Sequence, residues 1–198
     1  MKQAGRPRTK PAPERREDLM IAAERVFLAK GFENATIEEI AKGAGISKGA
    51  FYLHFTTKIE VAEALRDRFV QRLLNEITKA VEMEPEPDFR ARLQTWARAC
   101  AHGYLVAAAA HKLAFSAAPP PKDGLTNNIL IDDLRNLLSA GQSAGCWRVE
   151  EPALTAIFLF NALHGAIGMS ALETDSFARV ALLRALAAHF LRTVEAKA

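Results

Sequence analysis

The chain has 198 residues, of which 49% are hydrophobic and 25% are charged, and it carries a formal net charge of +3. A chain of this length buries one large or two modest cores without disulfides, and its two cysteines show no repeated spacing, which argues against a disulfide framework. No apolar run reaches the length of a membrane span, and the polar, proline-containing first thirteen residues are not typical of a secretory signal. We therefore expect a cytoplasmic protein.

The positive charge is concentrated at the N-terminus. Residues 1–66 hold 12 Lys or Arg and 9 Asp or Glu, which leaves the remainder of the chain neutral. A basic arm at residues 1–13 on a neutral body favours a polyanionic partner, although a solubilising tail has the same composition. The segment Gly5-Arg6-Pro7-Arg8 resembles the core of an AT-hook, a minor-groove element, but Ala4 stands where that pattern has its first arginine. A flexible arm that adds nonspecific phosphate contacts remains the alternative.

Helical periodicity covers almost every segment, and no stretch alternates apolar and polar residues for long enough to predict a strand. The first helix is expected from Glu14 to Lys30, and Gly31 behind it is typical of a left-handed C-terminal cap. We therefore expect an all-α protein.

Three helix starts follow in quick succession. Thr36 with Glu39 and Thr57 with Glu60 have the spacing of capping boxes, and Ser47 between them is a third N-cap residue. The helices that begin at the first two caps can therefore be only about two turns long.

Longer helices are expected after Thr57. There is no glycine or proline from Lys58 to Met83, so this segment predicts one helix of roughly 40 Å. A proline-containing loop is expected at 117–121. Further helices are expected at about 88–110, 126–143, 152–172 and 176–195.

Residues 36–55 have the short helix, tight turn and short helix of a helix-turn-helix. Ala41 supplies a small side chain where the two helices cross, and Gly45 supplies a positive φ at the turn. The residues expected to face inward are Ile37, Ile40, Ile46, Phe51 and Phe55. Those left on the outer face of the second helix are Ser47, Lys48, Gly49, Tyr52 and Leu53, a surface suited to a groove lined by phosphates.

Residues 17–65 resemble the DNA-binding domain of the tetracycline-repressor (TetR) family. The resemblance is carried by Ala23, Phe27, Gly31, Phe32, Thr36, Ile40, Ala41, Gly45, Ser47, Gly49, Tyr52, Phe55 and Lys58. It implies a helix-turn-helix domain over residues 14–57 and a helical ligand-binding and dimerisation domain over residues 58–198.

The resemblance also implies a set of DNA contacts at Thr36, Ser47, Lys48, Gly49, Ala50, Tyr52, His54 and Lys58. In that scheme Thr36 meets a phosphate, Lys48 approaches base edges in the major groove, and Lys58 touches a phosphate at the start of the long helix. Two alternatives stay open, namely that Tyr52 is a half-buried core residue and that His54 is an inert surface residue. Caps such as Thr36 and Ser47 are also needed in any helix, so they do not by themselves indicate DNA contact.

Residues 152–172 are apolar around nearly the whole helix, which must therefore be covered on both sides. One face holds Ile157, Phe160, His164 and Ile167, and the other holds Leu154, Phe158, Asn161, Gly165 and Gly168. Residues 176–195 carry a second apolar stripe of Phe177, Val180, Leu183, Leu186, Ala187, Phe190 and Val194. Together the two helices predict a homodimer through a four-helix bundle, with burial inside one subunit as the alternative.

The candidate ligand-binding residues are aromatic, sulfur-containing, polar and apolar side chains on the predicted helices of the body. They are Trp96, Cys100, Tyr104, Phe115, Leu134, Leu138, Asn161 and His164, and plain core is the alternative for most of them. Cys100 and His102 are too few ligands for a zinc site, so we expect neither metal nor cofactor.

These observations predict a repressor that a small, uncharged or weakly charged molecule releases from a pseudo-palindromic DNA operator. A constitutive repressor or architectural factor without effector is the alternative. The motifs of phosphate loops, nucleotide sites and nucleophile elbows are absent from the sequence, so we do not expect an enzyme.

Overall fold

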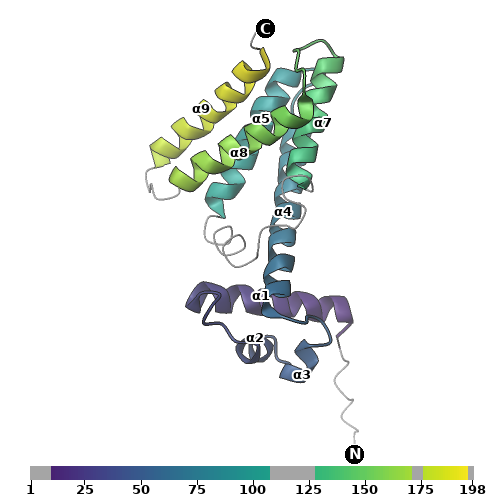
Figure 1. Cartoon of the computed structure of the whole chain (residues 1–198), viewed down its shortest axis with the longest axis vertical. Coiled ribbons are helices and arrows are strands. Elements are labelled where there is room, and N and C mark those ends of the chain that lie inside the picture. Colours follow the sequence, from purple (N-terminus) through teal and green to yellow (C-terminus); the bar gives the residue numbers. More distant parts are fainter. Residues whose placement is uncertain (1–9, 108–127, 171–175, 196–198) are drawn as a thin grey trace, which may run out of the picture. The chain divides into compact units, whose positions relative to one another are not determined.

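The computed structural model describes residues 10–107, 128–170 and 176–195. Within those ranges the chain forms helices and no strand, which confirms the all-α prediction. The described residues up to Asp67 form a compact N-terminal unit, and those from Arg68 onward form a C-terminal unit (Figure 1). No helix in this part of the chain combines the length and hydropathy that a membrane crossing needs.

The N-terminal unit is built from α1 (Ala12–Lys30), α2 (Ile37–Gly43), α3 (Lys48–Phe51) and the first turns of α4 (Lys58–Glu82). Helix α1 begins two residues earlier than expected, because a proline is well tolerated in the first turn of a helix, where its missing N–H is not needed. The basic residues before position 10 lie outside the described residues.

The core of the N-terminal unit takes side chains from all four of these helices. Three of its members, Val61, Ala62 and Leu65, lie on α4. The unit therefore extends to Asp67, whereas the sequence placed the boundary between residues 57 and 58. The other buried members are Leu19, Ala22, Ala23, Phe27, Ala35, Ile40, Ala41, Phe51 and Phe55.

Two glycines in this unit have positive φ. Gly45, between α2 and α3, has φ 69°, as the sequence predicts. Gly31 has φ 78° but ψ 159°, so it is not the left-handed helical cap that was expected, although its N–H still donates to the Phe27 carbonyl at 2.8 Å. The prediction was wrong in ψ because the chain leaves α1 in an extended direction.

Helix α3 is shorter than the two turns that were expected. It spans four residues and continues as a turn in which the His54 N–H donates to the Phe51 carbonyl at 2.9 Å. Helix α2, with seven residues, has the expected length.

The C-terminal unit contains the rest of α4 together with α5 (Phe89–Val106), α7 (Ile129–Ser143), α8 (Pro152–Ser170) and α9 (Ser176–Glu195). Helix α5 packs against α9, and α7 packs against α8. The expected bounds are met to within one or two residues for α4, α8 and α9. Helix α5 ends earlier than expected and α7 begins later, and the proline-containing loop between them lies outside the described residues.

Large aromatic side chains fill the core of the C-terminal unit. The ring of Trp96 on α5 stacks on Phe190 of α9 with centroids 6.1 Å apart, and its indole N–H donates to Asp133 at 2.7 Å. Trp147 packs so closely on Gly141 that a Cβ there would lie 2.0 Å from the indole ring. The stability of this core therefore depends on the close fit between neighbouring side chains as well as on their hydrophobicity.

Candidate nucleic-acid interface

The capping chemistry predicted for α2 and α3 is confirmed. The Thr36 hydroxyl accepts from the Glu39 N–H at 3.3 Å, and the Glu39 carboxylate accepts from the Thr36 N–H at 3.2 Å. At α3 the Ser47 hydroxyl accepts from the Ala50 N–H at 3.2 Å. These bonds fix where each short helix begins.

The third capping box differs by one residue from the prediction. Thr57 accepts from the Glu60 N–H at 3.1 Å as expected, but the Glu60 carboxylate accepts from the N–H of Thr56 at 2.6 Å. Helix α4 nevertheless starts at Lys58, as the sequence indicates.

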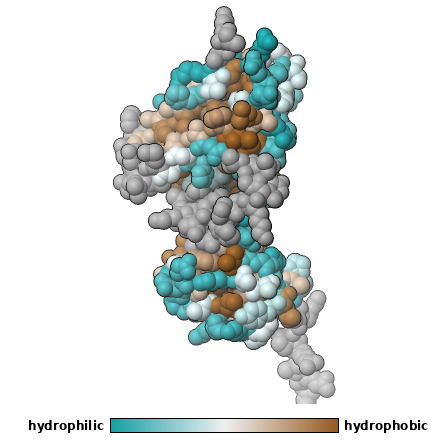
Figure 2. Space-filling model, in the orientation of Figure 1, coloured by the Kyte–Doolittle hydropathy of each residue, from teal (hydrophilic) through white to brown (hydrophobic). Residues whose placement is uncertain are grey.

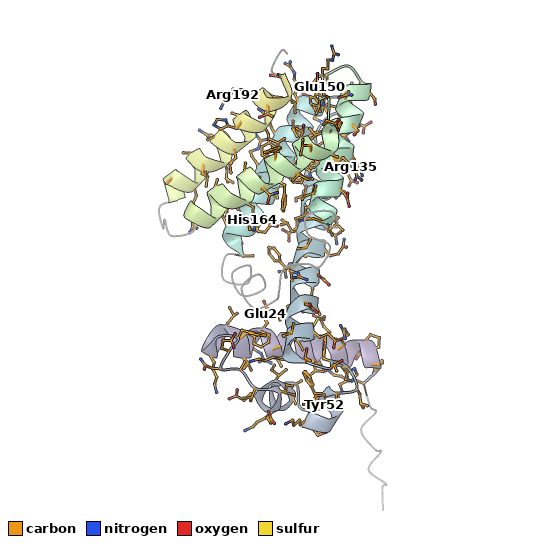
Figure 3. The ribbon with its side chains drawn as sticks, viewed as in Figure 1. Glu24, Tyr52, Arg135, Glu150, His164 and Arg192 are labelled. Atoms are coloured by element: carbon orange, nitrogen blue, oxygen red, sulfur yellow. The ribbon has the colours of Figure 1, made fainter. Side chains whose placement is uncertain are left out.

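The outer face of α3, defined by Ser47, Lys48, Gly49, Tyr52 and Leu53, is exposed, while Phe51 and Phe55 are buried. This is the division that the sequence predicts. Tyr52 is 49% exposed and lies on the α3 end of its unit (Figure 3), so part of its side chain is accessible to DNA. Its ring meets Phe51 edge-on at 5.6 Å between centroids. Ala50 and His54 are half-buried.

Lys48, the cation on the outer face of α3, forms an ion pair with Glu38 of α2. The hydrogen bond between them raises the pKa of Lys48 and lowers the pKa of Glu38. Both side chains are exposed, so water screens the pair and either partner can exchange it for another ion.

Lys58 is held by backbone carbonyls. Its ammonium donates to Phe32, Glu33 and Ala35 at 2.8, 3.0 and 3.2 Å, and it lies 4.6 Å from the centre of the Phe32 ring. A phosphate contact at Lys58, as the family resemblance implies, would have to displace one of these carbonyls.

Arg16 of α1 was not singled out by the sequence, yet it contacts the end of the recognition segment. Its guanidinium donates to the His54 carbonyl at 2.6 Å and lies 3.9 Å from the centre of the Phe55 ring. It joins residues 38 positions apart in the sequence. The only advance signal was the excess of basic residues among positions 1–16, which indicates charge and not a partner.

The structure places most candidate ligand residues in the packed core of the C-terminal unit. Trp96, Cys100, Leu134 and Leu138 are fully buried, and burial raises the pKa of the Cys100 thiol well above its usual range. Phe115 lies outside the described residues. Among the described residues, no three potential ligands gather as a metal ion would require.

Tyr104 and His164 do come together, as part of an aromatic cluster. Their rings meet edge-on at 5.2 Å, and Tyr104 also contacts Phe69 and Phe160 at 5.6 and 6.4 Å. His164 lies on the side of α8 that is turned toward α5 (Figure 3), and its partial burial lowers its pKa. Asn161 does not join them, because its side chain is exposed and donates to the Ile157 carbonyl of its own helix at 2.8 Å.

Two hollows in the C-terminal unit lie elsewhere. One, of about 780 Å³, is an open groove lined by residues of α5, α8, α9 and the α7–α8 loop, which include the charged Arg90 and Glu195 and the apolar Trp147. The other, of about 240 Å³, lies between α4 and α5 beside His102 and Gly103. The candidate ligand residues line neither of them.

Helix α8 divides into the two faces that the sequence predicts. Phe160 and Ile167 are buried in the core, whereas Leu154 and Phe158, on the opposite face, are 51% and 68% exposed. Hydrophobic residues gather over α8 on the visible face of the unit (Figure 2). The apolar stripe of α9 behaves differently, because Leu186, Ala187, Phe190 and Val194 are buried within the subunit.

Comparison with known proteins agrees with the geometry of the N-terminal unit. Residues 19–65 match the family described as bacterial regulatory proteins, tetR family. The chain carries a tetR-family domain. Because the match ends at residue 65, it covers the helix-turn-helix and the first turns of α4.

Curated relatives of the tetR-family domain include both activators and repressors. The chain is 39% identical over 84 residues to the transcriptional activator FasR of Mycolicibacterium smegmatis, a match that covers 42% of this chain and 37% of FasR. It is 45% identical over 62 residues to the transcriptional repressor BepR of Brucella suis, which covers 30% of each. The chain thus spans about a third of the length of these relatives.

Solved structures resemble the fold over a longer range. A tetR-family transcription regulator from Shewanella sp. PV-4 has a TM-score of 0.72 at 16% identity, and the match covers 92% of this chain and 99% of that one. The structure of RolR in complex with resorcinol has a TM-score of 0.59 at 23% identity, and the match covers 94% of this chain and 90% of RolR. At these identities the similarity shows the fold of the C-terminal unit and not its ligand.

Proposed function

We propose that this protein is a transcriptional regulator that binds double-stranded DNA through the outer face of α3 and the start of α2. The observation that carries the proposal is that outer face, with an exposed cation, a glycine and an exposed tyrosine, in a domain whose sequence matches the tetR family. The protein acts by binding and not by catalysis. It works in the cytoplasm, where the DNA is.

Within this interface the roles divide between base edges and phosphates. Lys48, Gly49 and Ala50 approach base edges, with Lys48 leaving Glu38 to do so. Tyr52 and His54 meet the backbone of the DNA, as do Thr36 and Ser47. Lys58 meets a phosphate at the start of α4, where its ammonium exchanges one of the backbone carbonyls that it binds in the free protein for a phosphate oxygen.

Two copies of the chain bind the DNA together. A recognition helix of this length reads few bases, so a pseudo-palindrome with half-sites about one helical turn apart supplies the remaining specificity. Leu154 and Phe158 on the exposed face of α8 supply the apolar contact between subunits, joined by small residues that allow close approach. The exposed part of α9 completes the interface.

The dimer is tested by Phe158→Lys, measured by light scattering and DNA binding. We expect a monomer that binds operator DNA at least tenfold more weakly, because only one half-site remains engaged. Met83→Lys serves as the matched control, since Met83 is also exposed and apolar but lies just beyond the end of α4. A variant that stays dimeric would contradict this assignment of the interface.

A small apolar or weakly polar molecule releases the protein from DNA by binding in the C-terminal unit. Support comes from the resorcinol bound by RolR, which shares the fold, and from the continuity of α4, which has 25 residues without a break. An insertion of Gly-Gly near Leu73 and Leu74 tests this coupling. If a ligand still bound and still released DNA to the same extent, α4 would not be the connecting element.

A constitutive DNA-binding protein is the second candidate. The observation that favours it is the tight burial of Trp96, Cys100, Leu134 and Leu138, which leaves the candidate pocket filled by the protein itself. A thermal melt that no member of a small-molecule library shifts would support this alternative.

Footprinting of the full-length protein on the DNA upstream of its own gene tests the proposed function. We expect protection of a symmetric site, which disappears on Lys48→Ala together with Tyr52→Ala. Uniform protection along the fragment would indicate nonspecific binding, and no protection would refute regulation of that promoter.

A further inference from the structure

Leu53, in the turn that follows α3, is a large apolar side chain that the packing of its own unit does not use. It is 82% exposed, and among the described residues it neither belongs to the core of the N-terminal unit nor packs against it. A single exposed leucine is common on protein surfaces and by itself indicates nothing. What distinguishes Leu53 is its position, on the outer face of α3, where the proposed function places DNA.

The helical path of the chain continues from α3 through Leu53. The Leu53 N–H donates to the Ala50 carbonyl at 3.3 Å, so the turn keeps the direction of the helix. With about 3.6 residues per turn, residues four positions apart share a face. Leu53 therefore lies one turn from Gly49, just as Tyr52 lies one turn from Lys48, and the four residues form one continuous surface.

Gly49 leaves the space beside Leu53 open. Its φ is not positive, and a Cβ added to it would meet, among the described residues, only the Ser47 hydroxyl oxygen at 3.9 Å, so no described neighbour requires a glycine here. Side chains on a helix tilt toward its N-terminus, so the Leu53 side chain leans toward the turn that contains Gly49. Because Gly49 has no side chain, a partner can approach the backbone closely and meet Leu53 in the same place.

The chemistry of leucine limits what Leu53 can bind on DNA. Its side chain has no donor and no acceptor, so it makes no hydrogen bond to a phosphate or to a base edge. In the major groove, the apolar group that projects from the base edges is the C5-methyl group of thymine, and apolar side chains contact it. Such a contact also discriminates between bases, because the other three bases do not carry this methyl group.

We propose that Leu53 is a specificity-determining residue, which reads a thymine in each half-site by apolar contact with its C5-methyl group. Lys48 and Leu53 then recognise different features of the same site, the first by hydrogen bonding and the second by apolar contact. The inference rests on the proposed function, since it needs the outer face of α3 to lie in the major groove. It goes further by naming a base and the group on that base that the protein recognises.

The experiment uses a duplex selected from a random-sequence library by the full-length protein. Each thymine is replaced in turn by deoxyuridine, symmetrically in the two half-sites, which removes the C5-methyl group and leaves the base pairing unchanged. Affinities are measured by fluorescence anisotropy at a fixed NaCl concentration for the wild type, Leu53→Ala and Leu28→Ala. Leu28→Ala is the matched control, because Leu28 is also an exposed leucine but lies on α1, outside the proposed interface.

At one thymine position, we expect deoxyuridine to weaken binding of the wild type by roughly fourfold per half-site, the effect of burying one methyl-sized group. Leu53→Ala should bind the thymine duplex more weakly than the wild type does. It should also bind the thymine and deoxyuridine duplexes with nearly equal affinity, because the methyl group has lost its partner. Leu28→Ala should behave as the wild type with both duplexes.

Three results would overturn the proposal and leave the proposed function intact. If Leu53→Ala lost affinity but kept the wild-type response to deoxyuridine at every position, Leu53 would contact the sugar-phosphate backbone and not a base. If no deoxyuridine substitution weakened the wild type, or if the selected half-sites contained no thymine, Leu53 would read no methyl group. If Leu53→Ala bound the selected duplex as tightly as the wild type, Leu53 would not contact the DNA.

Failure of the proposed function gives a different result. If the wild type enriches no sequence from the library, it does not read DNA, and the assignment of Leu53 fails with the proposed function. Selection with Leu53→Asn adds a second readout, because an amide suits adenine and not a methyl group. The sites enriched by Leu53→Asn should lose the preference for thymine at the position that deoxyuridine identifies and keep the spacing of the half-sites. A retained preference for thymine there would contradict the proposal.

Discussion

The N-terminal and C-terminal units are both helical, but different contacts define them. In the N-terminal unit, side chains bind the backbone: Thr36 and Ser47 cap short helices, and Lys58 and Arg16 each bind carbonyls far away in sequence. In the C-terminal unit, large apolar side chains such as Trp96 and Phe190 fill the space between long helices. Short helices have few internal hydrogen bonds and need such caps, whereas long helices are stabilised by packing.

This difference also separates what each unit is suited to do. In the N-terminal unit, hydrogen bonds from side chains to the backbone hold the short helices in place and leave the outer face of α3 exposed. A rigid, exposed face of this kind is suited to binding the regularly spaced groups of DNA. Apolar packing leaves one face of α8 uncovered, which suits association with another apolar surface. The comparison predicts that the two units respond to different kinds of substitution.

The largest effect is expected for Trp96→Ala in the C-terminal unit. Removing this fully buried ring should cost about 3–5 kcal/mol, since a cavity remains and Asp133 loses its indole donor. Urea unfolding followed by fluorescence measures it, because both tryptophans of the chain, Trp96 and Trp147, belong to this unit and Trp147 remains as the reporter. If amide exchange in α2 and α3 rose by as much, the contrast between the units would fail.

A smaller loss is expected for Gly141→Ala. The new Cβ would lie 2.0 Å from the Trp147 ring, and overpacking of this kind costs about 1–3 kcal/mol. Trp147→Phe shortens the opposing ring, so in the double variant the alanine should cost less than it does alone. Additive losses in urea unfolding would mean that the two residues do not meet.

Loss of a cap in the N-terminal unit is expected to cost about 1 kcal/mol. Ser47→Ala removes the acceptor for the Ala50 N–H, and Thr36→Ala removes that for Glu39. Amide exchange within α2 and α3 reports the effect, while tryptophan fluorescence should show no change. Ser47→Asn, which keeps a capping acceptor, serves as the control, and equal exchange in Ser47→Ala and Ser47→Asn would contradict the capping role.

The sequence predicted the capping residues and Gly45 because these signals act across a few neighbouring positions. It also located α4 and α9 closely, since helices of that length have a clear periodicity and clear ends. The contacts of Lys58 and Arg16 were not predictable in this way. Each joins elements more than twenty positions apart, and the residue type indicates a charge without indicating its partner.

The faces of α8 and α9 show a second limit. The spacing and type of the apolar residues separate the two faces of α8 correctly. The same reasoning assigned the apolar stripe of α9 to a bundle between subunits, whereas Phe190 and Val194 of that stripe are buried within the subunit. Asn161 was a candidate for the pocket because a polar residue in an apolar helix needs a partner, but it is exposed and binds its own backbone. An apolar pattern indicates that a face is covered and does not identify what covers it.

The smallest effect is expected for Glu38→Gln, which frees Lys48 and removes a negative charge near the DNA. Affinity for a random duplex should rise by about twofold, because exposed ion pairs are weak and screened by salt. In a Lys48→Met background the gain should shrink, since there is no cation to free. A gain of the same size in both backgrounds would mean that Glu38 acts only through repulsion of phosphate.

Selection of duplexes from a random-sequence library by the full-length protein tests the central claim most directly. If two copies read DNA through the outer face of α3, the enriched sequences should contain an inverted repeat with half-site centres about 34–36 Å apart, or a multiple of that distance. Lys48→Ala should change the preferred bases within each half-site and leave the spacing intact. Enrichment of no sequence, or of a single unrepeated site with the same base preference in Lys48→Ala, would contradict the account.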